Sequence, residues 1–185
     1  MDETNKAKTE TIEVPFRPDE EAPYIFISYA HADRKRIFPI IKRLYEKGWR
    51  VWYDEGLPVA ENYYASLSTH IKNCVLFLLF VTENSVRSEF VSEHELLLAV
   101  GARKRICLCC LNENAAFTGE AKDAIDIATV SKKNPKTDEA GLEAALTSVE
   151  ELTRFAPRTA VPYTVESVTG GRRHTIRAGG RRVRL

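Results

Sequence analysis

Two short apolar runs joined by an amphipathic segment constrain the fold of this 185-residue chain most strongly. The first run covers residues 24–29 and ends in the polar sequence AHAD, and the second covers residues 49–53 and ends in DEG. Between them, apolar side chains recur at helical spacing, at Ile37, Ile40, Ile41, Leu44 and Tyr45. We therefore expect a strand, a helix and a second strand, with polar residues after both strands. In open parallel sheets, that carboxyl-terminal edge is where ligands bind.

The rest of the chain continues this alternation of strands and helices. The uninterrupted apolar run 75–81 is typical of a strand buried on both faces of a parallel sheet. Residues 112–137 are weakly patterned, with room for a short helix near 119–125 and a short strand near 125–130. The remaining expected elements are a strand at 106–111, a turn at 82–85 and helices at 62–73, 86–101 and 138–153. This order predicts an α/β domain with a central parallel five-stranded sheet and helices on both faces.

The two ends of the chain differ from the middle in composition. Residues 1–22 are polar and lack periodicity, so we expect a flexible leader before a domain at 23–154. Residues 155–185 form a basic tail, with seven arginines against the single acid Glu166. Alternating residues at 163–168 and 172–178 flank a glycine pair, which leaves two readings open for the tail: a small β-ribbon or a disordered basic arm.

Composition also narrows the classes of protein to consider. The chain carries 27 basic and 26 acidic residues, and its longest apolar run is far too short to span a membrane. The amino terminus lacks the apolar core of a signal peptide, so we expect a cytoplasmic protein. The four cysteines fit buried thiols in a reducing compartment better than a zinc site, because a strand interior lacks the loop geometry that zinc requires. No P-loop or GxGxxG dinucleotide motif is found in the sequence.

Two motifs resemble the TIR (Toll/interleukin-1 receptor) domain family. FISYAHAD at residues 26–33 is similar to the first-strand box of that family, and WYDEGL at 52–57 is similar to the start of its second-strand loop. The resemblance implies a flavodoxin-like TIR fold over residues 23–154. It also implies that residues 57–62 form the loop with which family members contact a neighbouring subunit, although Ala60 stands where the family often has glycine.

A third segment, at residues 82–99, resembles the TIR segment in which a helix carries an aromatic residue and, about four positions later, a catalytic glutamate. Four positions after Phe90 the sequence has His94, with Glu93 and Glu95 on either side, so the segment carries one extra residue. The two glutamates point about 200° apart on a helix and cannot share one role. Glu95 keeps the better register with the following buried residues, and Glu93 remains the alternative.

The resemblance further implies that this glutamate cleaves the bond between nicotinamide and ribose in NAD+. Nicotinamide is already a cationic leaving group, so the barrier lies in the oxocarbenium character of the ribose, which a carboxylate can stabilise. The expected substrate pocket is formed by Ser28, Tyr29, His31, Asp54, Tyr63 and Phe90. Ordinary structural roles, such as a surface histidine at His31 or a backbone-bonded hydroxyl at Ser28, are the competing interpretation. A receiver-type phosphoacceptor at Asp54 is disfavoured, because the adjacent acids after the first strand are missing.

Two functions follow from the resemblance. The first is an NAD+ hydrolase or cyclase with no metal and no cofactor, which releases nicotinamide and an ADP-ribose signal that is linear, cyclic or conjugated. It is similar to the stand-alone bacterial TIR enzymes of Thoeris-type antiphage systems, whose product activates a separate effector protein. The second is a non-catalytic TIR module that works by self-association or TIR–TIR docking. Binding of nucleic acid by the arginine-rich tail is a third and weaker reading, since it rests on charge alone.

Overall fold

The computed structural model describes residues 8–21, 23–55, 63–132 and 136–169. The central sheet has five parallel strands in the order β3-β2-β4-β5-β6. These strands are β2 (Ile25–Ser28), β3 (Val51–Trp52), β4 (Leu76–Val81), β5 (Arg105–Cys110) and β6 (Lys136–Thr137). The direction of winding reverses between β2 and β4, as in the flavodoxin-like fold, which confirms the predicted fold class.

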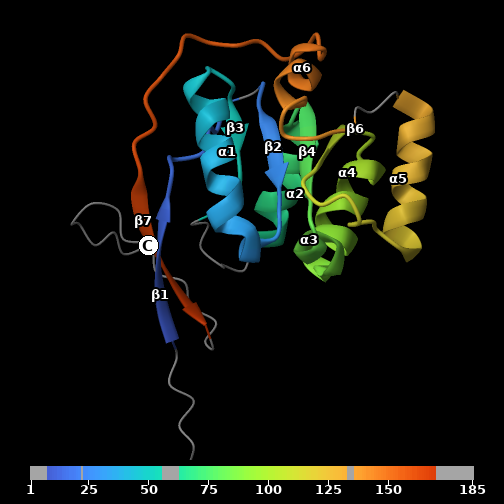
Figure 1. Ribbon diagram of the computed structural model, residues 1–185, viewed down its shortest axis with the longest axis horizontal. Coiled ribbons are helices and arrows are strands. Elements are labelled where there is room, and N and C mark those ends of the chain that lie inside the picture. Colours follow the sequence, from blue (N-terminus) through green and yellow to red (C-terminus); the bar gives the residue numbers. More distant parts are fainter. Residues whose placement is uncertain (1–7, 22, 56–62, 133–135, 170–185) are drawn as a thin grey trace, which may run out of the picture.

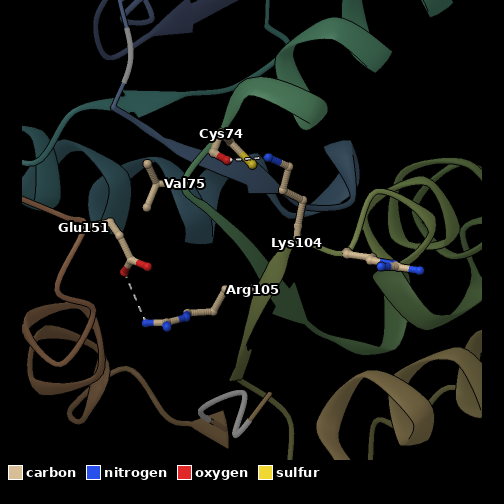
Figure 2. A pocket seen from close by; sticks show the side chains of 6 residues that line it. Cys74, Val75, Lys104, Arg105 and Glu151 are labelled. Carbon is tan, nitrogen blue, oxygen red and sulfur yellow. Dashed lines mark hydrogen bonds and ion pairs between the residues drawn. The ribbon is translucent and has the colours of Figure 1, made fainter. Parts of the chain in front are cut away.

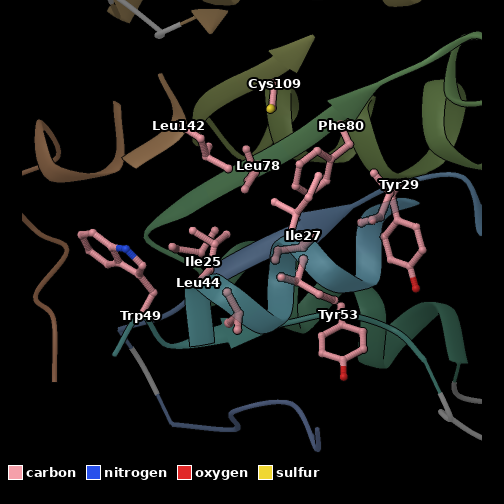
Figure 3. Close-up of a cluster of buried hydrophobic side chains, with 14 of the residues drawn as sticks. Ile25, Ile27, Tyr29, Leu44, Trp49, Tyr53, Leu78, Phe80, Cys109 and Leu142 are labelled. Atoms are coloured by element: carbon pink, nitrogen blue, oxygen red, sulfur yellow. The ribbon is translucent and has the colours of Figure 1, made fainter. Parts of the chain in front are cut away.

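Helices cover both faces of this sheet (Figure 1). The helical elements are η1 (His31–Asp33), α1 (Arg34–Glu46), α2 (Tyr63–Asn73), α3 (Glu83–Arg87), η2 (Phe90–Leu96), α4 (Leu97–Gly101), α5 (Gly119–Lys132) and α6 (Leu142–Thr147). Alternate residues of β2 separate the two cores. Ile25 and Ile27 pack with α1 and α6 on one face (Figure 3), whereas Phe26 packs with α2, η2 and α4 on the other.

Several predicted element boundaries were wrong. Residues 82–85 are not a simple turn, because Thr82 caps α3 and its side chain accepts a hydrogen bond from the Ser85 backbone N–H. The helix expected at 86–101 is divided into the last residues of α3, the π-helix η2 and α4. Helix α5 continues through the strand expected at 125–130, and the fifth strand follows at 136–137. The last helix covers only residues 142–147 of the expected 138–153.

The flexible leader predicted over residues 1–22 was wrong for residues 8–14, which form strand β1 (Lys8–Val14). This strand pairs antiparallel with β7 (Tyr163–Thr169) along its whole length, and the two form a separate ribbon beside the domain (Figure 1). The tail segment expected as a strand therefore pairs with the start of the chain, while its expected partner at 172–178 lies outside the described residues. Ile12, Val14 and Phe16 are buried in the α1-side core.

The segments next to this ribbon are attached to the β3 edge of the sheet. The Asp19 backbone N–H donates to the Val51 carbonyl at 3.0 Å, and the Val51 N–H donates to the Asp19 carboxylate at 3.0 Å. Arg158 then binds the same carboxylate through two hydrogen bonds of 2.9 and 2.8 Å. This arrangement occupies backbone groups that an edge strand would otherwise expose. The predicted contact loop at 57–62 lies outside the described residues.

Candidate active site

A cavity of about 270 Å³ opens at the carboxyl-terminal edge of the sheet, beside the point where the winding reverses. In open α/β sheets this position is the usual ligand crevice. The residues that line the cavity come from the ends of β2 and β3, from α2 and from the α3–η2 region: Tyr29, Ala30, His31, Asp54, Tyr63, Ser88, Phe90, Val91 and Glu95. The structure thus brings together, around one cavity, every residue that the sequence predicted for the pocket except Ser28, which lies beneath it.

The π-helix η2 determines which glutamate faces the cavity. A π-turn closes its hydrogen bond over five residues instead of four, so it accommodates the extra residue in this segment. Phe90 and Glu95, five positions apart, consequently both line the cavity. The Glu95 residue is only 3% exposed, whereas Glu93 is exposed to solvent. Of the two candidates, Glu95 is the one that the geometry places in the site.

Ser28 holds the Glu95 carboxylate from below. The Ser28 hydroxyl, at the end of β2, donates a hydrogen bond of 2.5 Å to Glu95 Oε2. Burial raises the pKa of Glu95 well above its ordinary value, and the nearby charge of Asp54 raises it further, while the Ser28 hydrogen bond opposes the shift. The site therefore contains a carboxyl group whose ionisation is costly unless a positive charge is brought next to it.

Asp54 is the second carboxylate of the site and has a different environment. His31 Nε2 lies 3.2 Å from Asp54 Oδ1, and the Tyr63 hydroxyl donates to Oδ2 at 2.8 Å. Burial opposes ionisation of Asp54, but these two partners outweigh it and hold its pKa below the ordinary value. Burial likewise tends to lower the pKa of His31, but Asp54 and Glu55 outweigh it and raise that pKa. The site thus pairs an ionised Asp54 with a Glu95 that resists ionisation.

Beside Asp54, Glu55 anchors the wall of the cavity through contacts that the sequence interpretation missed. Its Oε1 accepts hydrogen bonds from the Tyr29 hydroxyl at 2.5 Å and from Arg34 Nε at 2.6 Å. The Glu55 side chain is 3% exposed, so this ion pair is well shielded from water. The position of Glu55 directly after Asp54, just past the end of β3, could have indicated that Glu55 also belongs to the site. Ser88 and Val91 were also missed, because their placement depends on where α3 ends.

Tyr63 and Phe90, which line the cavity, belong to a cluster of aromatic rings. The ring of Phe90 lies 6.0 Å from Tyr63 and 6.3 Å from Tyr64, and the His94 ring lies 5.8 Å from both Phe90 and Tyr64. Tyr64 is 62% exposed, which is unusual for so large a ring. Flat rings on a cavity wall are suited to stacking on a planar heterocycle.

The polar side chains around the cavity can bind hydroxyl groups, and its carboxylates can also bind cations. Within the described ranges, no group of three or more His, Cys, Asp and Glu side chains is placed to hold a metal ion. The carboxylates of Asp54 and Glu95 remain available to the hydroxyls or positive charges of an organic ligand.

The molecule is thus a flavodoxin-like α/β protein, with a buried glutamate and a buried aspartate at the carboxyl-terminal edge of its parallel sheet. The sequence matches the TIR domain family over residues 25–146, and the chain belongs to that family. The match begins and ends within the domain expected at 23–154.

Two solved structures illustrate the structural likeness. A metazoan TIR-STING receptor from C. gigas is 21% identical, with a TM-score of 0.45 over 63% of this chain and 43% of that one. The TIR domains of the activated Roq1 resistosome, which directly recognises the pathogen effector XopQ, are 18% identical, with a TM-score of 0.44 over 70% of this chain and 75% of that one. The chain thus spans less than half of the TIR-STING receptor. A search of curated proteins gave no match. Among the described residues, no helix combines the length and apolarity needed to cross a membrane.

Proposed function

We propose that this protein is an NAD+ hydrolase or cyclase that cleaves the bond between nicotinamide and ribose. The observation that carries the proposal is the Glu95 carboxyl group, buried in the cavity wall and held by Ser28 at 2.5 Å. A buried carboxyl group with a raised pKa inside a cavity is a common mark of an active site. Members of the TIR family include NADases, which supports the same reading.

The charge balance of the cavity suits this substrate. The nicotinamide ring of NAD+ carries a positive charge, and a cation next to Glu95 would offset the cost of burying its carboxylate. Tyr63 and Phe90 line the same cavity and supply flat faces for the ring. The volume of about 270 Å³ is adequate for the nicotinamide and its ribose, while the remainder of the dinucleotide would extend past His31 and the mouth.

The chemical step follows from the same geometry. The bond from ribose C1′ to the nicotinamide nitrogen breaks, and its electron pair leaves with neutral nicotinamide, so no proton donor is needed. Positive charge then develops on the ribose, where ionised Glu95 stabilises it electrostatically and binds the sugar hydroxyls. Addition of water at C1′, with release of a proton, gives ADP-ribose. Addition of a nucleophilic nitrogen from the adenine gives a cyclic product instead.

The biological role is proposed on the resemblance of the WYDEGL segment to bacterial TIR enzymes. In this proposal the ADP-ribose product is a signal in antiphage defence, and a separate effector protein binds it. A cytoplasmic location fits the four cysteines, which are free thiols, three of them buried.

The direct test is incubation of the purified full chain with NAD+, followed by chromatography for nicotinamide and for the companion product. We expect stoichiometric release of nicotinamide and a product with the mass of ADP-ribose or of its cyclic form. Assays over a range of protein concentrations test whether assembly is required. Absence of turnover at every concentration, including under crowding that promotes assembly, would contradict the enzyme proposal.

A scaffold is the second candidate function, and exposed Tyr64 favours it. TIR domains commonly self-associate, and the ring cluster of Tyr64, Phe90 and His94 offers an aromatic surface to a neighbouring copy. Tyrosine is enriched at the centres of protein interfaces. If Tyr64→Ala abolishes assembly of a protein that never consumes NAD+, the scaffold reading is supported.

A further inference from the structure

A second cavity, of about 500 Å³, lies at the opposite edge of the sheet from the candidate active site. Its walls come from the residues that precede β4, from the connection between α4 and β5, from the start of β5 and from Glu151 after α6. Strand β4, which is about 20 Å long from its six residues at the usual rise, runs between these two edges. The second cavity therefore shares no residue with the first.

Three consecutive basic residues, Arg103, Lys104 and Arg105, line this cavity against the single acid Glu151. Lys104 Nζ donates to the Cys74 carbonyl at 2.9 Å, which places the ammonium group at the cavity wall (Figure 2). Arg105 Nη1 lies 3.5 Å from a carboxylate oxygen of Glu151, whose side chain is 59% exposed. An exposed pair of this length is weak, so an incoming anion can replace Glu151 at little cost.

The backbone at Arg103 shows that this residue is held there against its conformational preference. Its φ of 55° lies in the left-handed region, and it is the one non-glycine residue with positive φ among those described. Its N–H bonds to Val100 and that of Lys104 bonds to Ala99, the hydrogen-bond pattern of a helix end at which glycine is usual. Helix α1 ends in the same pattern, and there the residue with positive φ is Gly48.

We propose that this cavity is a binding site for a phosphate-bearing small molecule, with Arg103 and Arg105 as its anion-binding residues. Arginine side chains match phosphate oxygens with paired hydrogen bonds, and strained residues concentrate at functional positions. The volume exceeds what a single phosphate group fills and falls within the range of small-molecule sites. Val75, on the wall, offers an apolar contact to the rest of the ligand. This proposal does not depend on the catalytic proposal.

The test is calorimetric titration of the full chain with pyrophosphate at low salt, with adenosine and AMP as comparison ligands. We expect one site for pyrophosphate, no binding of adenosine, and affinity that falls as salt is added. Arg103→Gly and Arg105→Gln should each weaken binding at least about ten-fold. The control Lys42→Gln also removes a positive charge, but from an exposed side chain of α1, and should leave binding unchanged. Tighter binding of AMP than of pyrophosphate, which carries more charge, would show that the base contributes.

Arg103→Gly separates a binding defect from a folding defect, because glycine suits the left-handed backbone and should keep or raise the melting temperature. Three results would each overturn the proposal. They are the absence of pyrophosphate binding in the millimolar range, binding that is equal in wild type and in both arginine variants, and loss of binding in His31→Ala alone. The last result would assign the anion to the first cavity.

Discussion

Ser28 and Glu95 are 67 positions apart in the chain, yet their side-chain oxygens lie 2.5 Å from one another. Strand β2 fixes the hydroxyl and the π-helix η2 aims the carboxylate, so the pair depends on both elements being in register. The Ser28 hydrogen bond stabilises the ionised form of the Glu95 carboxyl group, whereas burial and Asp54 disfavour that form. The pKa of Glu95 therefore depends on Ser28, which can be tested.

The first prediction concerns the choice between the two glutamates. Glu95→Gln should lower kcat for nicotinamide release by at least about 100-fold, because it removes the charge that stabilises the developing cation. Glu93→Gln, on the exposed side of the same helix, should stay within about two-fold of wild type. Loss of turnover in Glu93→Gln alone would refute the assignment of Glu95.

The second prediction concerns the pH dependence of turnover. If ionised Glu95 is required, kcat/KM rises with pH as its carboxyl group loses a proton. Ser28→Ala removes the hydrogen bond that lowers this pKa, so the rising limb should move to higher pH. Ser92→Ala is the matched control, since that hydroxyl bonds to the Ser88 carbonyl instead. A rising limb that moves to lower pH in Ser28→Ala would contradict the proposed role of ionised Glu95.

The third prediction concerns stability. Because the pKa of Glu95 is raised in the folded state, the unfolded chain ionises first as pH increases. Wild type therefore loses stability as pH rises from the ordinary glutamate pKa to the raised one, and keeps it below that window. Glu95→Gln should thus increase the free energy of unfolding at pH 8 by more than about 1 kcal/mol, with a smaller gain at pH 4. Urea denaturation at both pH values checks this, and equal gains would contradict it.

The fourth prediction concerns Gly48, at the end of α1, which has φ of 92°. A Cβ atom there would lie 2.1 Å from the Phe155 backbone oxygen, and backbone cannot move aside cheaply. We expect Gly48→Ala to cost about 2–4 kcal/mol in unfolding free energy. Gly101→Ala is the control, because no atom lies within 4 Å of the added Cβ, and it should be neutral or stabilising by about 0.5–1 kcal/mol.

The fifth prediction concerns the ion pair between Asp19 and Arg158, which connects the segments on either side of the domain. The Arg158 guanidinium also donates to the Trp49 carbonyl at 2.8 Å and lies 3.8 Å from the centre of the Tyr45 ring. A double-mutant cycle with Asp19→Ala and Arg158→Ala should give a coupling energy of about 1–2 kcal/mol. The exposed pair of Arg154 and Glu143 should give less than about 0.5 kcal/mol. Comparable values for the two pairs would contradict the structural role of Arg158.

The sequence predicted the central sheet well because burial leaves a local mark. The apolar run at 75–81 corresponds to β4, which is buried at every position. The pocket residues could be predicted because they directly follow strands or share a helix with an aromatic residue. Glu95 could be favoured over Glu93 only through the register of the residues after it, since neither glutamate differs locally from a solvated helix residue.

The errors arose where the structure depends on distant contacts. The π-turn at η2 cannot be predicted from its own seven residues, because it forms where Glu95 contacts Ser28 of the distant strand β2. Strand β6 has only two residues and follows a helix longer than its pattern suggested. Strand β1 did leave a signal that was missed, since buried Ile12 and Val14 alternate with exposed Thr11 and Glu13. The polar composition of β1 obscured that signal. Its pairing partner, β7, is more than 140 residues away along the chain, so no neighbouring segment indicated a ribbon.

The pairing of β1 with β7 has a consequence for the order in which the molecule is made. Val14 pairs with Tyr163 and Lys8 with Thr169, so strand β1 is synthesised well before the segment with which it pairs. At ordinary translation rates of about 5–20 residues per second, the two are separated by about 10–30 s. Throughout that interval Ile12 and Val14 have no partner strand on the ribosome. During synthesis the chain therefore carries β1 as an unpaired, partly apolar β-strand, and the ribbon forms only when β7 emerges.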